Sequence, residues 1–95
     1  MLFVTSAAKK KLKDRLVTEK KEDNSLIRIT SSSLLSGRLG FILDNEKHGD
    51  RIIKDEEGEK LLLIDIEMEK IISGMVLDYK MLGDIGMQFT IREKN

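Results

Sequence analysis

The feature that most limits the possible folds is a change in the spacing of apolar residues near Leu26. Before this point, Ala8, Leu12 and Leu16 recur every fourth position, which places them on one face of an α-helix. After it, the apolar residues form short runs rich in isoleucine and leucine, separated by Gly, Asn, Asp and Ser, as is typical of β-strands. The sequence therefore predicts one amphipathic helix followed mainly by strands, an α+β arrangement rather than a regular alternation of strands and helices.

The helical stripe predicts a first helix from about Ala7 to Glu19. Thr5 or Ser6 can cap this helix, because either hydroxyl can accept a hydrogen bond from a free amide of the first turn. Lysine and aspartate residues occupy much of the remaining helix surface. The polar segment from Lys20 to Ser25 should then form a loop that leads to the strands.

A second, short helix is predicted between two strands, from about Ile66 to Ser73. Asp65 is a suitable N-cap, since its carboxylate can accept hydrogen bonds from the free amides of the first turn. Glu67 and Glu69 suit the positive end of the helix dipole. Gly74 should end the helix by taking a left-handed conformation.

Short apolar runs bounded by turn-forming residues are predicted to be the strands. They are Leu2–Val4, Leu26–Thr30, Leu39–Leu43, Arg51–Lys54, Lys60–Ile64, Met75–Tyr79 and Gln88–Arg92. The segment from Glu56 to Glu59, with Gly58 at the position that needs an unusual backbone conformation, has a length suited to a hairpin turn. Such short links favour mostly antiparallel or mixed strand pairing.

The inward positions of these elements predict a buried core. Its members should be Leu16, Ile27, Ile29, Phe41, Ile64, Ile72, Leu77 and Phe89. Core filling is also the simplest role for the methionines Met68, Met75, Met81 and Met87. A chain of 95 residues without proline, internal repeat or low-complexity linker favours a single domain over residues 1–95.

Charge and cysteine content narrow the possible functions. Seventeen basic residues balance seventeen acidic ones, so no overall field attracts the protein to nucleic acid or to an anionic membrane, and neither partner is expected. The absence of cysteine excludes disulfides, thiolate zinc sites, thiolate nucleophiles and cysteine-held clusters. The longest apolar run, Leu61–Ile64, is too short to cross a membrane, and the N-terminus lacks the pattern of a secretion signal. We therefore expect a cytoplasmic protein.

One polar loop has the residue types of a metal site. His48 is the only histidine, and Asp44, Glu46 and Asp50 lie close to it in the sequence. Carboxylate and imidazole groups of this kind can bind a divalent cation. The spacing does not match a calcium loop, however, and a solvated hairpin turn is the simpler interpretation.

Three other polar clusters also have simpler interpretations than a site. Ser31–Ser33 and Ser36 can bind an anion, but a serine nucleophile needs a base and a third group to orient it. Lys9–Lys11 and Lys13 lack interleaved aromatic residues, so a solvated helix face is favoured over phosphate binding. The acidic cluster Asp55–Glu59 indicates an exposed turn. We assign no catalytic, cofactor-binding or metal-binding residue, and we expect neither a cofactor nor an enzyme.

Four short motifs follow one another along nearly the whole chain. They are Val4-Thr5-Ser6-Ala7-Ala8 followed by Leu12 and Leu16, Ser36-Gly37 followed by Phe41, the segment Asp65–Tyr79 ending in Ser73-Gly74-Met75-Val76-Leu77-Asp78-Tyr79, and Gly86-Met87-Gln88-Phe89. Each motif is short, and their order is more informative than any one of them. On these residues the chain resembles the HesB/IscA family of iron–sulfur assembly proteins.

The resemblance implies a mostly β fold and a history in iron–sulfur cluster assembly. In that family one cysteine precedes the Ser-Gly pair and two more lie in a C-terminal Cys-Gly-Cys segment, and these thiolates hold iron or a cluster, often between subunits. Here Leu35 occupies the first position, and no counterpart of the second segment follows Phe89 before Asn95. Because leucine has no lone pair to donate, we transfer no metal ligand from the family to this chain.

Two functional hypotheses follow from the sequence. The first is a non-catalytic binding or protein-interaction module, a cysteine-free relative of the cluster carriers that recognises a protein partner or forms a homodimer through retained surfaces. The alternative is an iron or iron–sulfur cluster assembly and delivery protein that uses non-cysteine ligands or thiols supplied by a partner. An enzyme ranks third, because no pairing of base and nucleophile is visible.

Overall fold

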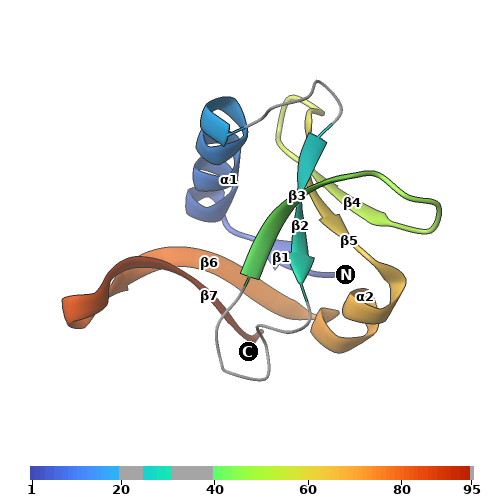
Figure 1. Cartoon of the computed structure of the whole chain (residues 1–95). Helices are drawn as coiled ribbons and strands as arrows, with labels where there is room; N and C mark the ends of the chain where they lie inside the picture. Colours follow the sequence, from blue (N-terminus) through green and yellow to red (C-terminus); the bar gives the residue numbers. More distant parts are fainter. Residues whose placement is uncertain (20–24, 31–39, 95) are drawn as a thin grey trace.

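Two β-sheets and two α-helices form the structure, a computed structural model that describes residues 1–19, 25–30 and 40–94 (Figure 1). In chain order the elements are β1 (Phe3–Val4), α1 (Ser6–Glu19), β2 (Ser25–Thr30), β3 (Gly40–Asn45), β4 (Arg51–Lys54), β5 (Lys60–Ile64), α2 (Ile66–Ile72), β6 (Met75–Leu82), the 3₁₀ turn η2 (Gly83–Ile85) and β7 (Gly86–Glu93). This order confirms the predicted α+β class. Neither helix in the described ranges is long and apolar enough to cross a membrane.

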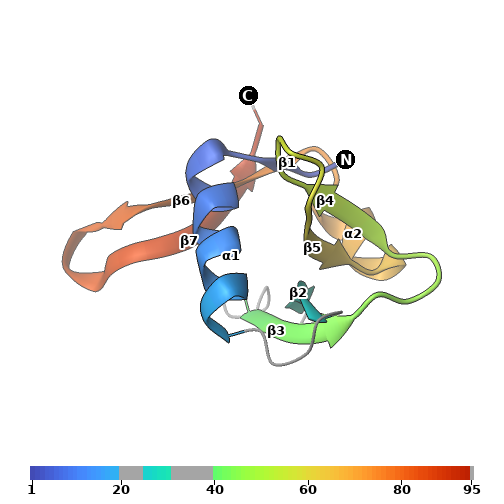
Figure 2. The same cartoon turned by 90° about the horizontal axis from the view of Figure 1, so that it is seen from above.

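The strands pair in mixed directions, as the sequence predicted. In the larger sheet the strand order is β3-β2-β5-β4, and β2 runs parallel to β5 but antiparallel to β3. In the smaller sheet the order is β1-β6-β7, with β1 parallel and β7 antiparallel to β6. The hairpin of β6 and β7 extends away from α1 and the larger sheet in both views of the molecule (Figures 1 and 2).

The first helix packs on the core through the predicted stripe. Ala8, Leu12 and Leu16 are all buried on it. Of the two predicted caps, Thr5 is the one used: its Oγ1 accepts a hydrogen bond from the backbone N–H of Ala8 at 3.2 Å. The same hydroxyl donates to Asp78 of β6 at 2.8 Å, so the start of α1 is tied directly to the smaller sheet.

The local signals around α2 and the turn between β4 and β5 are confirmed. Asp65 caps α2, since its Oδ1 accepts a hydrogen bond from the backbone N–H of Met68 at 2.8 Å. Gly74 follows the helix with a φ of +83°, a conformation that side chains with a Cβ rarely adopt. Gly58 has a φ of +85° in the turn, where Asp55 Oδ1 accepts from two backbone N–H groups.

The hairpin of β6 and β7 is longer than predicted. The first strand, predicted as Met75–Tyr79, continues to Leu82. The second, predicted as Gln88–Arg92, already begins at Gly86, so only η2 joins the two strands. Lys80-Met81-Leu82 contains no strand breaker, and the chain turns only between Gly83, the first residue of η2, and Gly86, the residue after it. At the other end of the strand region, Ser25 belongs to β2 rather than to the predicted loop, whose remaining residues 20–24 lie outside the described part of the chain, as does Leu39.

Most of the predicted core is buried, with two corrections. Leu16, Ile27, Ile29, Ile64, Ile72 and Leu77 are buried as predicted. Phe41 and Phe89 are only partly buried, because their rings lie at the edge of the core where α1 and the hairpin separate. The prediction for the methionines is also partly wrong: Met68 is fully buried and Met75 packs against the core, but Met81 and Met87 lie exposed on the hairpin.

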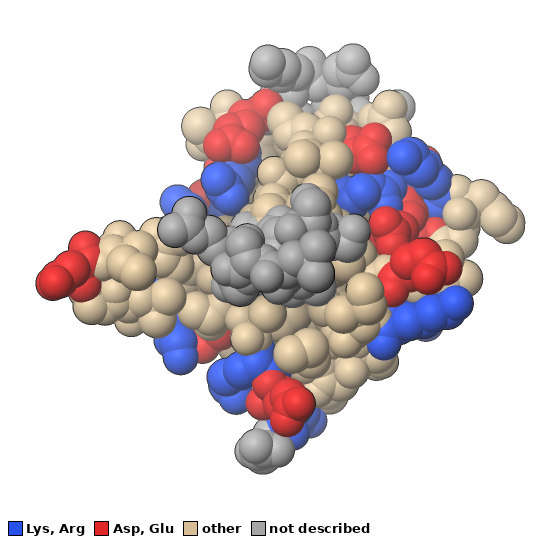
Figure 3. Space-filling model, turned by 60° about the horizontal axis from the view of Figure 1, so that its bottom comes forward, with Lys and Arg blue, Asp and Glu red and all other residues tan. Residues whose placement is uncertain are grey.

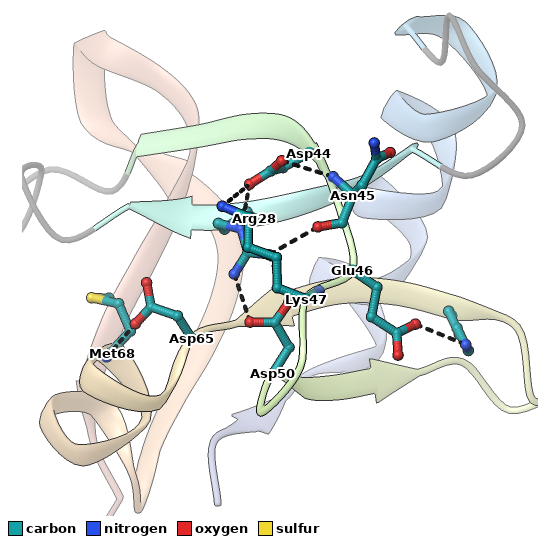
Figure 4. A network of polar contacts seen from close by, with 9 residues as sticks. Arg28, Asp44, Asn45, Glu46, Lys47, Asp50, Asp65 and Met68 are labelled. Carbon is teal, nitrogen blue, oxygen red and sulfur yellow. Dashed lines mark hydrogen bonds and ion pairs between the residues drawn. The ribbon is translucent and has the colours of Figure 1, made fainter.

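A buried arginine joins β2 to the end of β3 and to the loop that follows it (Figure 4). Arg28 is 5% exposed, and its guanidinium donates to Asp44 Oδ2 from Nε at 2.7 Å. It also donates to both carboxylate oxygens of Asp50, at 2.9 and 2.6 Å, and to the backbone carbonyl of Asn45 at 3.1 Å. Bidentate pairing of this kind is the strong form of an arginine–carboxylate contact. The charge is therefore fully paired inside the fold.

This network lowers the pKa of both Asp44 and Asp50. The Arg28 guanidinium is the main reason why the pKa of Asp50 lies below its ordinary value near 3.8. The pKa of Asp44 is also lowered, first by the hydrogen bond from the backbone N–H of Asn45 and then by Arg28. Since a lowered pKa favours the ionised form in the folded state, the network stabilises the fold above the ordinary pKa and loses this effect as the pH falls below it.

We expect Leu12→Ala to lower the free energy of unfolding by about 2 to 5 kcal/mol, because it leaves a cavity beneath α1. Val17→Ala is the matched control on the same helix, since Val17 is exposed. Its effect should stay within about 0.5 kcal/mol. Urea unfolding followed by circular dichroism measures both, and equal effects would show that the buried stripe has been placed wrongly.

We expect Asp50→Asn to cost about 3 to 5 kcal/mol at neutral pH, because it leaves one side of a buried guanidinium unpaired. Between about pH 5 and about pH 2, the wild-type protein should lose stability more steeply than this variant, which has no Asp50 carboxylate to protonate. Glu46→Gln is the control, since Glu46 pairs with Lys60 at the surface, and it should cost no more than about 1 kcal/mol. Parallel pH profiles for wild type and Asp50→Asn would contradict the assigned coupling.

Candidate interaction surface

The face of the β6–β7 hairpin that points toward the core is apolar along most of its length. Residues paired across the two strands point to the same side, and alternate pairs share a face. The successive pairs on this face are Leu77 with Ile91, Tyr79 with Phe89, and Met81 with Met87. The first pair packs in or against the core, the second is half-buried, and the third is exposed. The apolar face is thus longer than the core that covers it.

The end of the hairpin carries a cluster of exposed apolar side chains, which we call the apolar tip. It consists of Met81, Leu82, Ile85 and Met87. Ile85 is 73% exposed, Met81 62% and Met87 44%. Figure 3 shows the projecting hairpin on the left as mainly uncharged surface with an acidic group at its far end, whereas acidic and basic side chains are frequent over the rest of this view. Contiguous exposed apolar surface of this kind is typical of interaction sites.

An open groove of about 440 Å³ lies beside the tip, between α1 and the hairpin. Tyr79, Met87 and Phe89 contribute from the hairpin, and Lys11 and Arg15 contribute from the helix. Because Lys11 and Arg15 are four positions apart, they lie on one face of α1, next to the buried stripe. The groove therefore continues the apolar face of the hairpin up to the wall of the helix.

Aromatic rings and cations pack against one another in this groove and at its edge, where Phe41 lies. The ring centroids of Tyr79 and Phe89 are 4.9 Å apart, and Phe41 from β3 lies 4.7 Å from Phe89. Lys11 Nζ lies 5.6 Å from the Tyr79 ring centroid, and Arg15 Cζ lies 6.0 Å from that of Phe89, within the range of cation–π contacts. These contacts hold the aromatic rings in place while leaving part of their surface accessible.

Among the described residues, those that line the groove offer contact area to a partner and no cluster of catalytic or metal-binding groups. Asp14, Thr18, Glu19 and Gln88 complete its lining, so that acidic and basic groups occur together on its walls. Rings, a thioether and the aliphatic stems of Lys11 and Arg15 supply the contact area. Sequence analysis did not predict this surface. The alternation of apolar residues through Met81 and Met87 was the available signal, but it could not distinguish a covered face from an exposed one.

The predicted histidine loop is a turn, and its acids already have partners. His48 is exposed in the turn between β3 and β4, which the backbone N–H of Asp50 closes by donating to the carbonyl of Lys47. Asp44 and Asp50 bind Arg28, and Glu46 binds Lys60 at 2.9 Å. Among the residues that the structure describes, no three acidic or histidine side chains are grouped to hold a metal ion. Arg28 itself was missed, although a charged residue inside the apolar run of β2 was a visible signal.

The basic and acidic clusters contact each other, which the sequence did not predict. Lys9 Nζ lies 3.3 Å from Glu56, and Lys13 Nζ lies 3.3 Å from Asp55. The side chain of Asp55 is only 6% exposed, so the expectation of a fully solvated acidic turn is wrong at this residue. The cause is that α1 packs beside the β4–β5 turn and covers it. The Lys9–Glu56 pair is exposed on its acidic side and should contribute little to stability, but both pairs align the helix with the larger sheet.

The remaining predicted positions lie outside the described residues. These are the serines Ser31, Ser32, Ser33 and Ser36, together with Leu35 and Gly37. The described chain stops at Thr30 of β2 before these positions and resumes at Gly40, which directly precedes Phe41.

Known proteins resemble this chain in structure more than in sequence. No family model and no curated protein matches the sequence. Among solved structures, SufA of Escherichia coli, described as involved in biosynthesis of iron–sulfur clusters, superposes with a TM-score of 0.63 at 18% identity, over 97% of this chain and 84% of SufA.

Two further structures show the same similarity. A crystal structure of IscA with a [2Fe-2S] cluster gives a TM-score of 0.61 at 22% identity, over 100% of this chain and 86% of that one. A protein from Aquifex aeolicus, solved by NMR, gives 0.64 at 25% identity, over 98% and 91%. The match extends over nearly the whole chain in each case. This chain therefore has the fold of the SufA and IscA proteins, as its resemblance to the HesB/IscA family predicted.

Proposed function

We propose that this protein is a non-catalytic interaction module that associates through its apolar tip and the adjoining groove, and that the partner is a second copy of the same chain. The observation that carries this proposal is the apolar face of the β6–β7 hairpin, which continues beyond the core to the exposed pair Met81 and Met87. Methionine-rich surfaces adapt their shape to a partner because the side chain is flexible and polarisable.

Two features favour a second copy as the partner. The formal net charge of the chain is zero, so two copies do not repel each other as strongly charged proteins do. The tip and the groove also adjoin on one molecule, which lets two copies place equivalent surfaces against each other around a two-fold axis. Each tip can then cover apolar residues of the other.

The size of the surface sets the expected strength of the association. A stable interface buries about 800 Å² on each partner, and four partly exposed side chains supply only part of that area. Contact with the neighbouring groove must supply the rest. We therefore expect a reversible dimer with a dissociation constant of about 10⁻⁶ to 10⁻⁴ M rather than an obligate one.

Replacing Ile85 with aspartate should abolish this association, because it replaces the most exposed apolar side chain of the tip with a charge. Val17→Asp is the matched control: it makes the same change of charge at an exposed aliphatic residue on α1, and it should leave the association unchanged. Sedimentation velocity over a range of protein concentrations measures both. A wild-type protein that remains monomeric up to about 1 mM, well above the expected dissociation constant, would contradict the proposal.

The absence of native cysteine permits a second, direct test. Ile85→Cys introduces the only thiol of the chain, and oxidation should join two copies if the tips lie near the two-fold axis. Val17→Cys carries an equally unique and exposed thiol away from the tip. Disulfide formation at equal rates in both variants would indicate random collision instead of a specific contact.

The shared fold also supports a second candidate function, delivery of iron or an iron–sulfur cluster as cargo, since one structure with this fold contains a [2Fe-2S] cluster. Clusters are commonly held by four cysteine thiolates, and this chain supplies none. Cargo binding would therefore require thiols from a partner or oxygen and nitrogen ligands.

We expect the purified protein to show no charge-transfer absorption after anaerobic reconstitution with iron and sulfide. Leu35→Cys restores one thiolate per chain and should give at most a weak, labile colour through sharing between two copies. Ultraviolet–visible spectra and bound-iron analysis measure the outcome. A stable, stoichiometric cluster on the unmodified protein would favour the cargo function and would require ligands other than cysteine.

A further inference from the structure

The two methionines of the apolar tip differ from those of the core in their access to solvent. Met81 and Met87 are exposed, whereas Met68 on the inner face of α2 is 0% exposed and Met75 packs against the core. Met81 and Met87 are also paired directly across β6 and β7, so their thioethers lie on the same face of the hairpin. Met87 additionally lines the groove.

The composition of the chain makes these thioethers its most accessible sulfur atoms. Cysteine thiolates usually react first with oxidants, but this chain contains no cysteine. Met1 is the only other exposed methionine, and it lies at the opposite end of the chain from the tip residues. An oxidant that reaches the folded protein therefore meets the sulfur atoms of the proposed interaction surface before those of the core.

We propose that Met81 and Met87 form a peroxide-sensitive modification site that controls association through the apolar tip. The thioether sulfur attacks one oxygen of hydrogen peroxide, an S–O bond forms and the O–O bond breaks. The released hydroxide takes up the remaining proton to form water. Sulfur loses two electrons, peroxide gains them, and the product is methionine sulfoxide, which reductases can convert back to the thioether.

The consequence of this reaction follows from the polarity of the product, and it rests on the proposed function. A sulfoxide oxygen is a strong hydrogen-bond acceptor, and an apolar contact between two tips offers it no donor. Burying such a group without a partner is unfavourable. Because a dimer contains two copies of the pair, four such groups enter one contact. Oxidation should therefore weaken the association by at least about tenfold.

The test compares the wild-type protein with the double variant Met81→Leu and Met87→Leu. Leucine keeps the tip apolar and of similar volume but removes the oxidisable sulfur. Both proteins are treated with a limited amount of hydrogen peroxide, mapped by peptide mass spectrometry and examined by sedimentation velocity. We expect the wild type to gain one oxygen at each of Met81 and Met87 well before Met68, and to lose association. The double variant should associate with or without peroxide, although its Met1 is oxidised as well.

Two outcomes would overturn the inference. One is oxidation of Met68 at the same rate as Met81 and Met87, and the other is a fully oxidised tip that associates as strongly as the untreated protein. If the untreated wild type and the double variant are both monomeric, the proposed function fails and control of association fails with it. The peptide map then still decides whether the pair is the selective site of oxidation.

Discussion

The packing of α1 against both sheets is the contact on which the rest of the structure depends. Its buried stripe contacts β2 and β5 of the larger sheet and β6 of the smaller one. The hydrogen bond from Thr5 to Asp78 fixes the beginning of the helix to β6, while Lys9 and Lys13 contact the turn between β4 and β5. The helix therefore holds two sheets together that share no strand. It also covers part of the hairpin, together with β1 and Phe41 of β3, and the end of the hairpin projects beyond this cover.

Local chemistry made much of this fold predictable from the sequence. The cap at Asp65, the left-handed glycines Gly58 and Gly74 and the stripe of α1 depend on neighbouring residues, so their signals are contained in short segments. The exposure of Met81 and Met87 depends instead on how far the other elements extend along the hairpin. Strand alternation shows which side chains share a face, but it does not show whether another element covers that face. The candidate surface was missed for this reason.

Arg28 illustrates the same limit for polar residues. A charged side chain within an apolar strand is recognisable in the sequence, but its partners come from the far side of a turn, sixteen and twenty-two positions away. Once the register of β2 with β3 is known, the acids that were considered as metal ligands are seen to surround a guanidinium. The acids Asp44 and Asp50, whose residue type suits a metal site, are thus used in ion pairs with Arg28 inside the fold. Its similarity to SufA and IscA extends to the arrangement of elements, whereas chemistry depends on the side chains placed upon them.

The buried guanidinium also constrains how this sequence can change over generations. Arg28 contacts Asp44 and Asp50 at once, so loss of either acid leaves a buried positive charge partly uncompensated, and loss of the arginine leaves two acids facing each other. Stepwise replacement would pass through unstable intermediates at every order of events. The three positions should therefore be inherited as a unit: among natural relatives, a chain with an apolar residue at the place of Arg28 should have lost both acids as well.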